Sequence, residues 1–256
     1  MKKITLLCAI LLIATMSMSM VAGTEITSST KVSGEMTSRL TKEGYNIEKI
    51  SFEKDTITST IVSTKSDSTG PNEILALRAV TNEVRALALK NDDSLAGIKS
   101  MKQIIKNSDN EIISEDELVN FQTVCKDFED SMQLKNGVIK HTKKETRQLI
   151  EGTFKEQDIS VNIIGITESK LAGYLVVLEM VDHNNDIDMI NDTLWQIDTI
   201  ISKLNIDGAM IGEFILSAAN ANDRNEIIYL MAADLMFRDF LWWQSPELLG
   251  TGSWCH

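Results

Sequence analysis

The segment YNIEKISFEKDTITSTIV, residues 45–62, decides the fold because it has a counterpart in ISVNIIGITESKLAGYLVV, residues 159–177. At an offset of 114 residues the apolar positions of the two segments coincide, so that Ile47 meets Val161. In both segments apolar and polar residues alternate on either side of a short polar turn, which is typical of a β-hairpin. Self-similarity that continues at nearly one offset indicates an internal duplication.

A helix is predicted after the hairpin in each copy. Residues 71–91 begin with a proline and carry apolar side chains at helical spacing, and residues 186–205 begin with Asp186 and Asp188, either of which is a natural N-cap. Two further short strands complete each copy, within residues 96–113 and 211–230. The sequence therefore predicts an α+β fold of two tandem duplicated ββαββ units, each a small antiparallel sheet with a covering helix.

A helical connector is predicted between the two copies. Ser114 and Glu117 have the spacing of a capping box, and Thr142 and Glu145 repeat that spacing further on. The apolar stripe after Ser114 includes Cys125. The predicted organisation is a signal peptide or N-terminal anchor at 1–23, a first α+β repeat at 24–113, a helical connector at 114–157, a second α+β repeat at 158–230, and an apolar aromatic helix with a C-terminal tail at 231–256.

The N-terminal segment indicates export. Lys2 and Lys3 precede an apolar stretch that passes into smaller residues, which is the pattern of a secretory signal peptide, and we predict cleavage after Gly23. An uncleaved anchor is the alternative, because residues 4–22 are nearly long enough to span a bilayer. Either reading places the body of the chain outside the cytoplasm, secreted or at the cell surface. Membrane contact is expected only through an uncleaved signal segment.

The charge of the chain limits its partners. Lys and Arg number 25 against 37 Asp and Glu, which gives a formal net charge of −12. Nucleic-acid binding requires a positive surface, and the only basic run, residues 140–147, is short. We therefore expect no nucleic-acid partner, but another envelope or extracellular protein, or a small ligand. Cys125 and Cys255 could pair in an oxidising compartment, and the sequence leaves this open.

Aromatic residues gather at the C-terminus, where residues 235–256 hold five of the fourteen in the chain. At an offset of about 115 this segment takes the place of the connector helix, which predicts a helix that is apolar nearly all round. Exposed aromatic patches usually mark contacts, so Phe237, Trp242 and Trp243 are the leading hypothesis for an interaction surface. The alternative is that this helix belongs to the core of the same chain.

No motif in the sequence specifies a reaction. The chain has no GxSxG, HExxH, P-loop or GxGxxG pattern, and none of its three histidines stands beside a plausible nucleophile. We therefore expect a protein that is not an enzyme.

The segment DHNNDID, residues 182–188, is the one candidate for a metal site. Its oxygen-bearing side chains alternate as in a calcium loop: Asp182, Asn184, Asp186 and Asp188. The sixth and twelfth positions, however, hold Ile187 and Thr193 where an EF-hand needs glycine and glutamate. A polar loop that caps the following helix explains the same residues without an ion. No cofactor is therefore expected, and calcium is the one candidate ion.

These observations together favour a secreted or surface-tethered, non-enzymatic binding or assembly module. One alternative is a metal-dependent hydrolase that uses Asp182, His183 and Asp186 of the 182–188 loop. Another is a structural component of the envelope without a discrete ligand.

Overall fold

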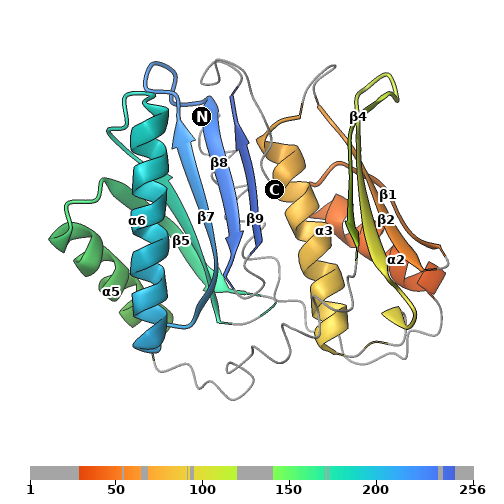
Figure 1. Cartoon of the computed structure of the whole chain (residues 1–256), viewed down its shortest axis with the longest axis horizontal. Helices are drawn as coiled ribbons and strands as arrows, with labels where there is room; N and C mark the ends of the chain where they lie inside the picture. The colour runs from red at the N-terminus through yellow and green to blue at the C-terminus, as the bar shows by residue number, and fades with distance from the viewer. Residues whose placement is uncertain are drawn as a thin grey trace. The chain divides into compact units, whose positions relative to one another are not determined.

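The computed structural model describes residues 29–53, 55–64, 69–90, 92, 95–119, 141–169, 171, 173–235 and 239–245. The chain divides into two compact units, which the described residues represent as 29–119 and 141–245 (Figure 1). The predicted signal peptide, Cys125, Phe237 and Cys255 lie outside the described residues.

Over its described residues, the N-terminal unit consists of a four-stranded sheet and two helices. Its elements are α2 (Ser29–Lys42), β1 (Ile47–Glu53), β2 (Thr56–Val62), α3 (Pro71–Leu89), β3 (Ser100–Lys106) and β4 (Ile112–Val119). The strand order is β1-β2-β3-β4, in which the outer pairs are antiparallel and β2 runs parallel to β3. A parallel pair cannot be joined by a tight turn, and α3 supplies the crossover between β2 and β3.

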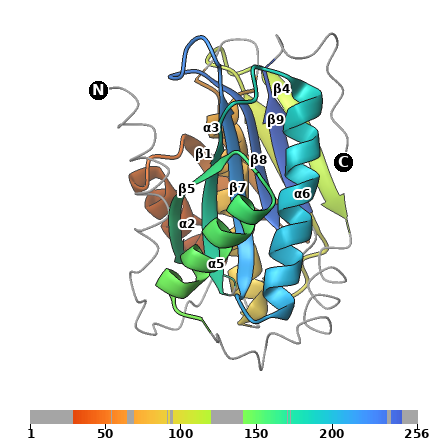
Figure 2. The same ribbon diagram turned by 90° about the vertical axis from the view of Figure 1, so that its left-hand side faces the viewer.

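The described residues of the C-terminal unit repeat this order and include one further strand. Its elements are α5 (Lys143–Glu156), β5 (Val161–Glu168), β6 (Tyr174–Met180), α6 (Ile187–Ile206), β7 (Ile211–Ala219), β8 (Ile227–Asp234) and β9 (Asp239–Gln244). The strand order is β5-β6-β7-β8-β9, and only the central pair of β6 and β7 is parallel. Helix α6 makes the crossover, and Figure 2 shows α5 and α6 over the same face of this sheet.

The predicted α+β fold and the duplicated ββαββ order are confirmed, since β1-β2-α3-β3-β4 is followed by β5-β6-α6-β7-β8. The repeat also includes a helix at the start of each unit: α2 was not predicted, whereas α5 was predicted as part of the connector. Ser29 and Lys143 begin α2 and α5, and they are 114 residues apart, as are Ile47 and Val161 at the start of the first strands. Each sheet is mixed rather than purely antiparallel, because the helix crossover makes its two flanking strands parallel.

The duplication extends to the side chains that close the second hairpin of each ββαββ copy, β3–β4 and β7–β8. Asn107 Nδ2 donates to Glu111 Oε2 at 3.0 Å after β3, and Asn220 Nδ2 donates to Glu226 Oε2 at 2.7 Å after β7. In both hairpins the asparagine Oδ1 also accepts the backbone N–H two residues further on, at 3.0 and 2.9 Å. A local side-chain turn of this kind stabilises the loop without help from other elements.

The prediction of a helix that begins at Ser114 is wrong for residues 114–119, because residues 112–119 form β4. Residues 114–119 have good helix formers and a capping-box spacing, yet they pair with β3 in register, so that Leu118 lies opposite Met101. Antiparallel pairing with a strand already in the sheet outweighs local helix propensity, which is a weak preference per residue. The rest of the predicted connector up to residue 140 lies outside the described residues. The second capping box, Thr142 with Glu145, is confirmed at the start of α5.

The aromatic helix predicted at 231–256 is also wrong where the structure describes it. Residues 231–234 complete β8, and residues 239–244 form the edge strand β9. Trp242 lies opposite Met231 and Trp243 lies opposite Leu230, so the two indoles point to opposite faces of the sheet. The segment has apolar side chains in every direction, which suggested a helix buried on two sides. In the structure these side chains lie on both faces of a strand.

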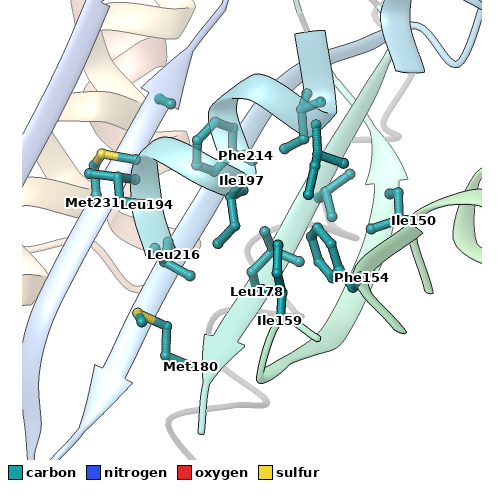
Figure 3. Close-up of a cluster of buried hydrophobic side chains, with 14 of the residues drawn as sticks. Ile150, Phe154, Ile159, Leu178, Met180, Leu194, Ile197, Phe214, Leu216 and Met231 are labelled. Carbon is teal, nitrogen blue, oxygen red and sulfur yellow. The ribbon is translucent and has the colours of Figure 1, made fainter. Parts of the chain in front are cut away.

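The core of the C-terminal unit lies between the sheet and its two helices (Figure 3). Ile150 and Phe154 of α5 meet side chains from α6 and from β6 and β7, among them Ile197, Leu178 and Phe214. All five are at most 3% exposed. Each such side chain contributes about 1.5–3 kcal/mol by leaving water, so this layer holds α6 in place.

A glycine fixes the close approach of the β5–β6 turn to the start of β7. Gly173 has φ +65°, and a Cβ at this position would collide with the backbone carbonyl of Met210, to which Tyr174 N–H donates at 2.8 Å. Gly44 also has a positive φ, +97°, but open space surrounds it. An alanine at position 44 would therefore meet backbone strain alone, whereas an alanine at position 173 would meet both backbone strain and a steric collision.

We predict that Gly173→Ala destabilises the protein more than Gly44→Ala. Gly44→Ala should lower the free energy of unfolding by about 1–2 kcal/mol through the left-handed backbone alone. Gly173→Ala should lower it by about 1–3 kcal/mol more, because the turn must move away from β7. Urea denaturation of both variants measures the difference, and equal losses would contradict the close approach.

Candidate functional site

The loop between β6 and α6, residues 181–186, lies where the parallel strands β6 and β7 end. Asp182, Asn184 and Asn185 all have left-handed backbones, with φ of 59°, 50° and 60°. Asparagine and aspartate tolerate this conformation better than other residues with a side chain. The loop can therefore turn sharply from β6 into α6.

His183 is the buried residue of this loop, with 4% of its surface exposed. Its Nδ1 accepts the Asn185 backbone N–H at 3.2 Å, and its ring also forms a hydrogen bond with the backbone of Ala219 in β7. A ring nitrogen that accepts carries no proton, so this geometry requires neutral histidine. Burial lowers the pKa of His183 below its usual value of 6.5, and the Ala219 hydrogen bond and the charge of Asp182 oppose that shift.

Asn185 ties the same loop to the β7–β8 loop. Its Nδ2 donates to Asn220 Oδ1 at 3.0 Å, and its Oδ1 accepts the Ala221 N–H at 2.8 Å. Asn220 is the residue that closes its own hairpin through Glu226. The two loops thus form one hydrogen-bonded platform at this end of the sheet.

One of the four candidate metal ligands has a structural role. Asp186 caps α6, since its Oδ1 accepts the N–H groups of Asp188 at 3.0 Å and Met189 at 3.2 Å. Asp182 and Asn184 are exposed. Over the described ranges, no three or more His, Cys, Asp and Glu side chains gather closely enough to hold a metal ion. Asp182, His183 and Asp186, the residues of the predicted hydrolase, are accordingly not brought together as such a group.

The two described residues of the predicted aromatic surface, Trp242 and Trp243, are not exposed as expected. Trp243 is 6% exposed, and Trp242 is half-buried and packs against the core of its unit. Phe237 lies outside the described residues. Of the three tryptophans that the structure describes, Trp195 of α6 is the one that faces solvent, at 66% exposed.

Trp195 belongs to an exposed stripe on α6, on the side turned away from the sheet. The outward stripe consists of Trp195, Thr199, Ser202 and Ile206, which are spaced by four, three and four residues and are all exposed. Ile206, at 82% exposed, marks its far end. The buried residues of the same helix face the core instead: Ile190, Leu194, Ile197, Ile200, Ile201 and Leu204. Figure 2 shows that α6 runs along the outside of its sheet.

Acidic residues lie around the N-terminal end of the outward stripe, where Trp195 is. Asp188 and Asp192 are exposed and lie seven and three residues before Trp195. Asp198, three residues after it, is half-buried, and burial raises the pKa of its carboxyl. Lys203 is the one basic residue of α6. The helix therefore presents an indole next to negative charge.

Trp195 was not singled out from the sequence, although a signal for it exists. Residues 190, 194, 197, 201 and 204 follow one apolar stripe at helical spacing, and Trp195 falls off that stripe. A large aromatic on the polar side of an otherwise amphipathic helix departs from the amphipathic pattern, and that departure is visible in the sequence.

Comparison with known proteins yields no family. No family model matches the chain, and no curated protein matches it. Among solved structures, it is weakly similar to the C-terminal domain of the sex pheromone staph-cAM373 precursor from Staphylococcus aureus, with 10% identity and a TM-score of 0.23. That match covers 74% of this chain and 64% of the other, so the chain spans less than two thirds of its length.

Among the helices described, none combines the length and the apolar character that crossing a bilayer requires.

The His183 geometry predicts a pH-dependent stability. Its pKa is lower in the folded than in the unfolded chain, so the unfolded chain binds the proton more readily below about pH 6.5. The stabilising contribution of neutral His183 is therefore complete above pH 6.5 and decreases as the pH falls toward the folded pKa. Urea unfolding of the wild type and His183→Asn between pH 7.5 and 5 should show a steeper loss for the wild type. Parallel curves would contradict the prediction.

Proposed function

We propose that this protein is a non-enzymatic binding module that acts outside the cytoplasm, secreted or tethered at the cell surface, with the outward stripe of α6 as its contact surface. The exposure of Trp195 is the observation that carries the proposal. Tryptophan is among the residues most enriched in binding hot spots, because its large ring gains much from burial against a partner.

The rest of the unit makes this exposure unusual. Phe154, Tyr174, Phe214 and Tyr229 are each at most 7% exposed. The unit thus buries aromatic side chains efficiently, yet α6 holds an indole and the Ile206 side chain in water. Leaving such apolar surface exposed forgoes about 25 cal/mol for each Å² that burial would stabilise. Contact with a partner would recover that free energy.

The location rests on the N-terminal sequence pattern. Residues 1–23 have the basic start and apolar stretch of a signal segment. The acidic composition supports solubility outside the cell and disfavours anionic surfaces such as nucleic acids and acidic lipids.

Site-specific photocross-linking in the native cell tests the proposal. A benzoylphenylalanine at position 195 should give a discrete adduct in the extracytoplasmic fraction. The same probe at Lys144, an exposed residue of α5, is the matched control and should give none. The absence of an adduct at position 195, or an identical set of adducts at both positions, would overturn the proposed contact surface.

A stability control separates binding from folding. Because Trp195 is mostly exposed, Trp195→Ala should change the free energy of unfolding by no more than about 0.5 kcal/mol. The variant should also lose the acrylamide-quenchable fluorescence that Trp195 itself contributes. A large loss of stability would mean that Trp195 supports the fold rather than a contact.

A further inference from the structure

The charges beside the outward stripe distinguish between possible partners. No ion pair among the described residues involves Asp188 or Asp192. Both carboxylates lie within two helical turns N-terminal to Trp195, on the exposed side of α6. A partner that covers the indole must therefore also meet this negative charge.

A second copy of the chain fits this surface poorly. A stable interface needs about 800 Å² from each partner, whereas the outward stripe offers two large apolar side chains separated by Thr199 and Ser202. The chain is also acidic as a whole, with a formal net charge of −12, so two copies repel each other. A positively charged partner gains from both the carboxylates and the indole.

We infer that the outward stripe binds a basic segment of a partner protein, which places a lysine or arginine over the Trp195 indole beside Asp188 and Asp192 and an apolar side chain against Ile206. This inference rests on the proposed function and names the chemistry of the partner. A cation over a tryptophan face is attracted by the ring, and nearby carboxylates strengthen that attraction.

The spacing of the stripe sets the size of the bound segment. Trp195 and Ile206 are eleven residues apart on α6, which corresponds to about 16 Å along the axis at 1.5 Å per residue. A helix of about 12 residues, or a shorter extended segment, spans this distance. Its basic residues belong at the Trp195 end, because the acidic side chains lie there.

Binding of a defined probe to residues 24–256, the chain without the predicted signal segment, tests the inference. The probe is an 18-residue amphipathic peptide of lysine and leucine, carrying a fluorophore, and its affinity is measured by fluorescence anisotropy at 50 and 300 mM NaCl. Trp195→Ala should weaken binding about tenfold or more, and Trp195→Phe should restore part of the loss. Asp188→Asn with Asp192→Asn should weaken binding about tenfold at low salt and less at high salt, because salt screens exposed charges.

Two controls distinguish this surface from general attraction to an acidic protein. Glu117→Gln with Glu156→Gln removes the same number of exposed carboxylates from β4 and α5 and should leave the affinity unchanged. A peptide with glutamate in place of lysine should not bind. Equal weakening by the control variant, or unchanged binding by Trp195→Ala, would overturn the inference.

The remaining outcomes separate this inference from the proposed function. An adduct at position 195 in cells, with no binding of the basic peptide in solution, would overturn the basic partner while the contact surface stands. Analytical ultracentrifugation could instead show a dimer that Trp195→Ala abolishes. That result would assign the outward stripe to a second copy of the chain and would overturn the inference of a basic partner.

Discussion

The parallel pairing of β6 with β7 is the constraint on which the C-terminal unit depends. Two adjacent strands that run the same way cannot be joined by a short turn, so the chain must return across the sheet, and α6 makes that return. One side of α6 then seals the core, with Ile190, Ile197 and Ile201 fully buried. The opposite side necessarily faces away from the sheet, and there Trp195 and Ile206 remain in solvent.

The same constraint operates in the N-terminal unit, where β2 and β3 are parallel and α3 makes the crossover. The two copies also close their last hairpins with the same asparagine geometry, at Asn107 and Asn220. In the second copy Asn220 also receives a hydrogen bond from Asn185, which joins the hairpin to the loop before α6. Within the described residues, the second sheet has a fifth strand, β9.

Much of the architecture could be predicted from the sequence because the signals are local. Alternating side chains identified the first hairpin of each copy, and Thr142 and Asp186 cap the helices that they were expected to cap. The errors lie where a local signal competes with a distant partner. Residues 114–119 favour a helix by composition, but pairing with β3 makes them a strand.

For the candidate site, too, the local signals could be recognised in the sequence, but the contacts between side chains could not. Asp182, Asn184 and Asp188 could be selected from their spacing, but spacing does not show that Asp186 is already engaged by the N–H groups of α6. The role of His183 was equally hidden, because its partners come from both Asn185 and Ala219.

The sequence by itself determined the duplication, the order of hairpin and helix in each copy, the helix caps and the acidic charge, since each depends on residues close in the chain or on composition alone. Only the tertiary structure decided that the sheets are mixed and that Trp242 and Trp243 lie in a strand. It also decided that Trp243 is buried while Trp195 is exposed. Burial and strand pairing depend on neighbours that are distant in sequence, so no local pattern of residues specifies them.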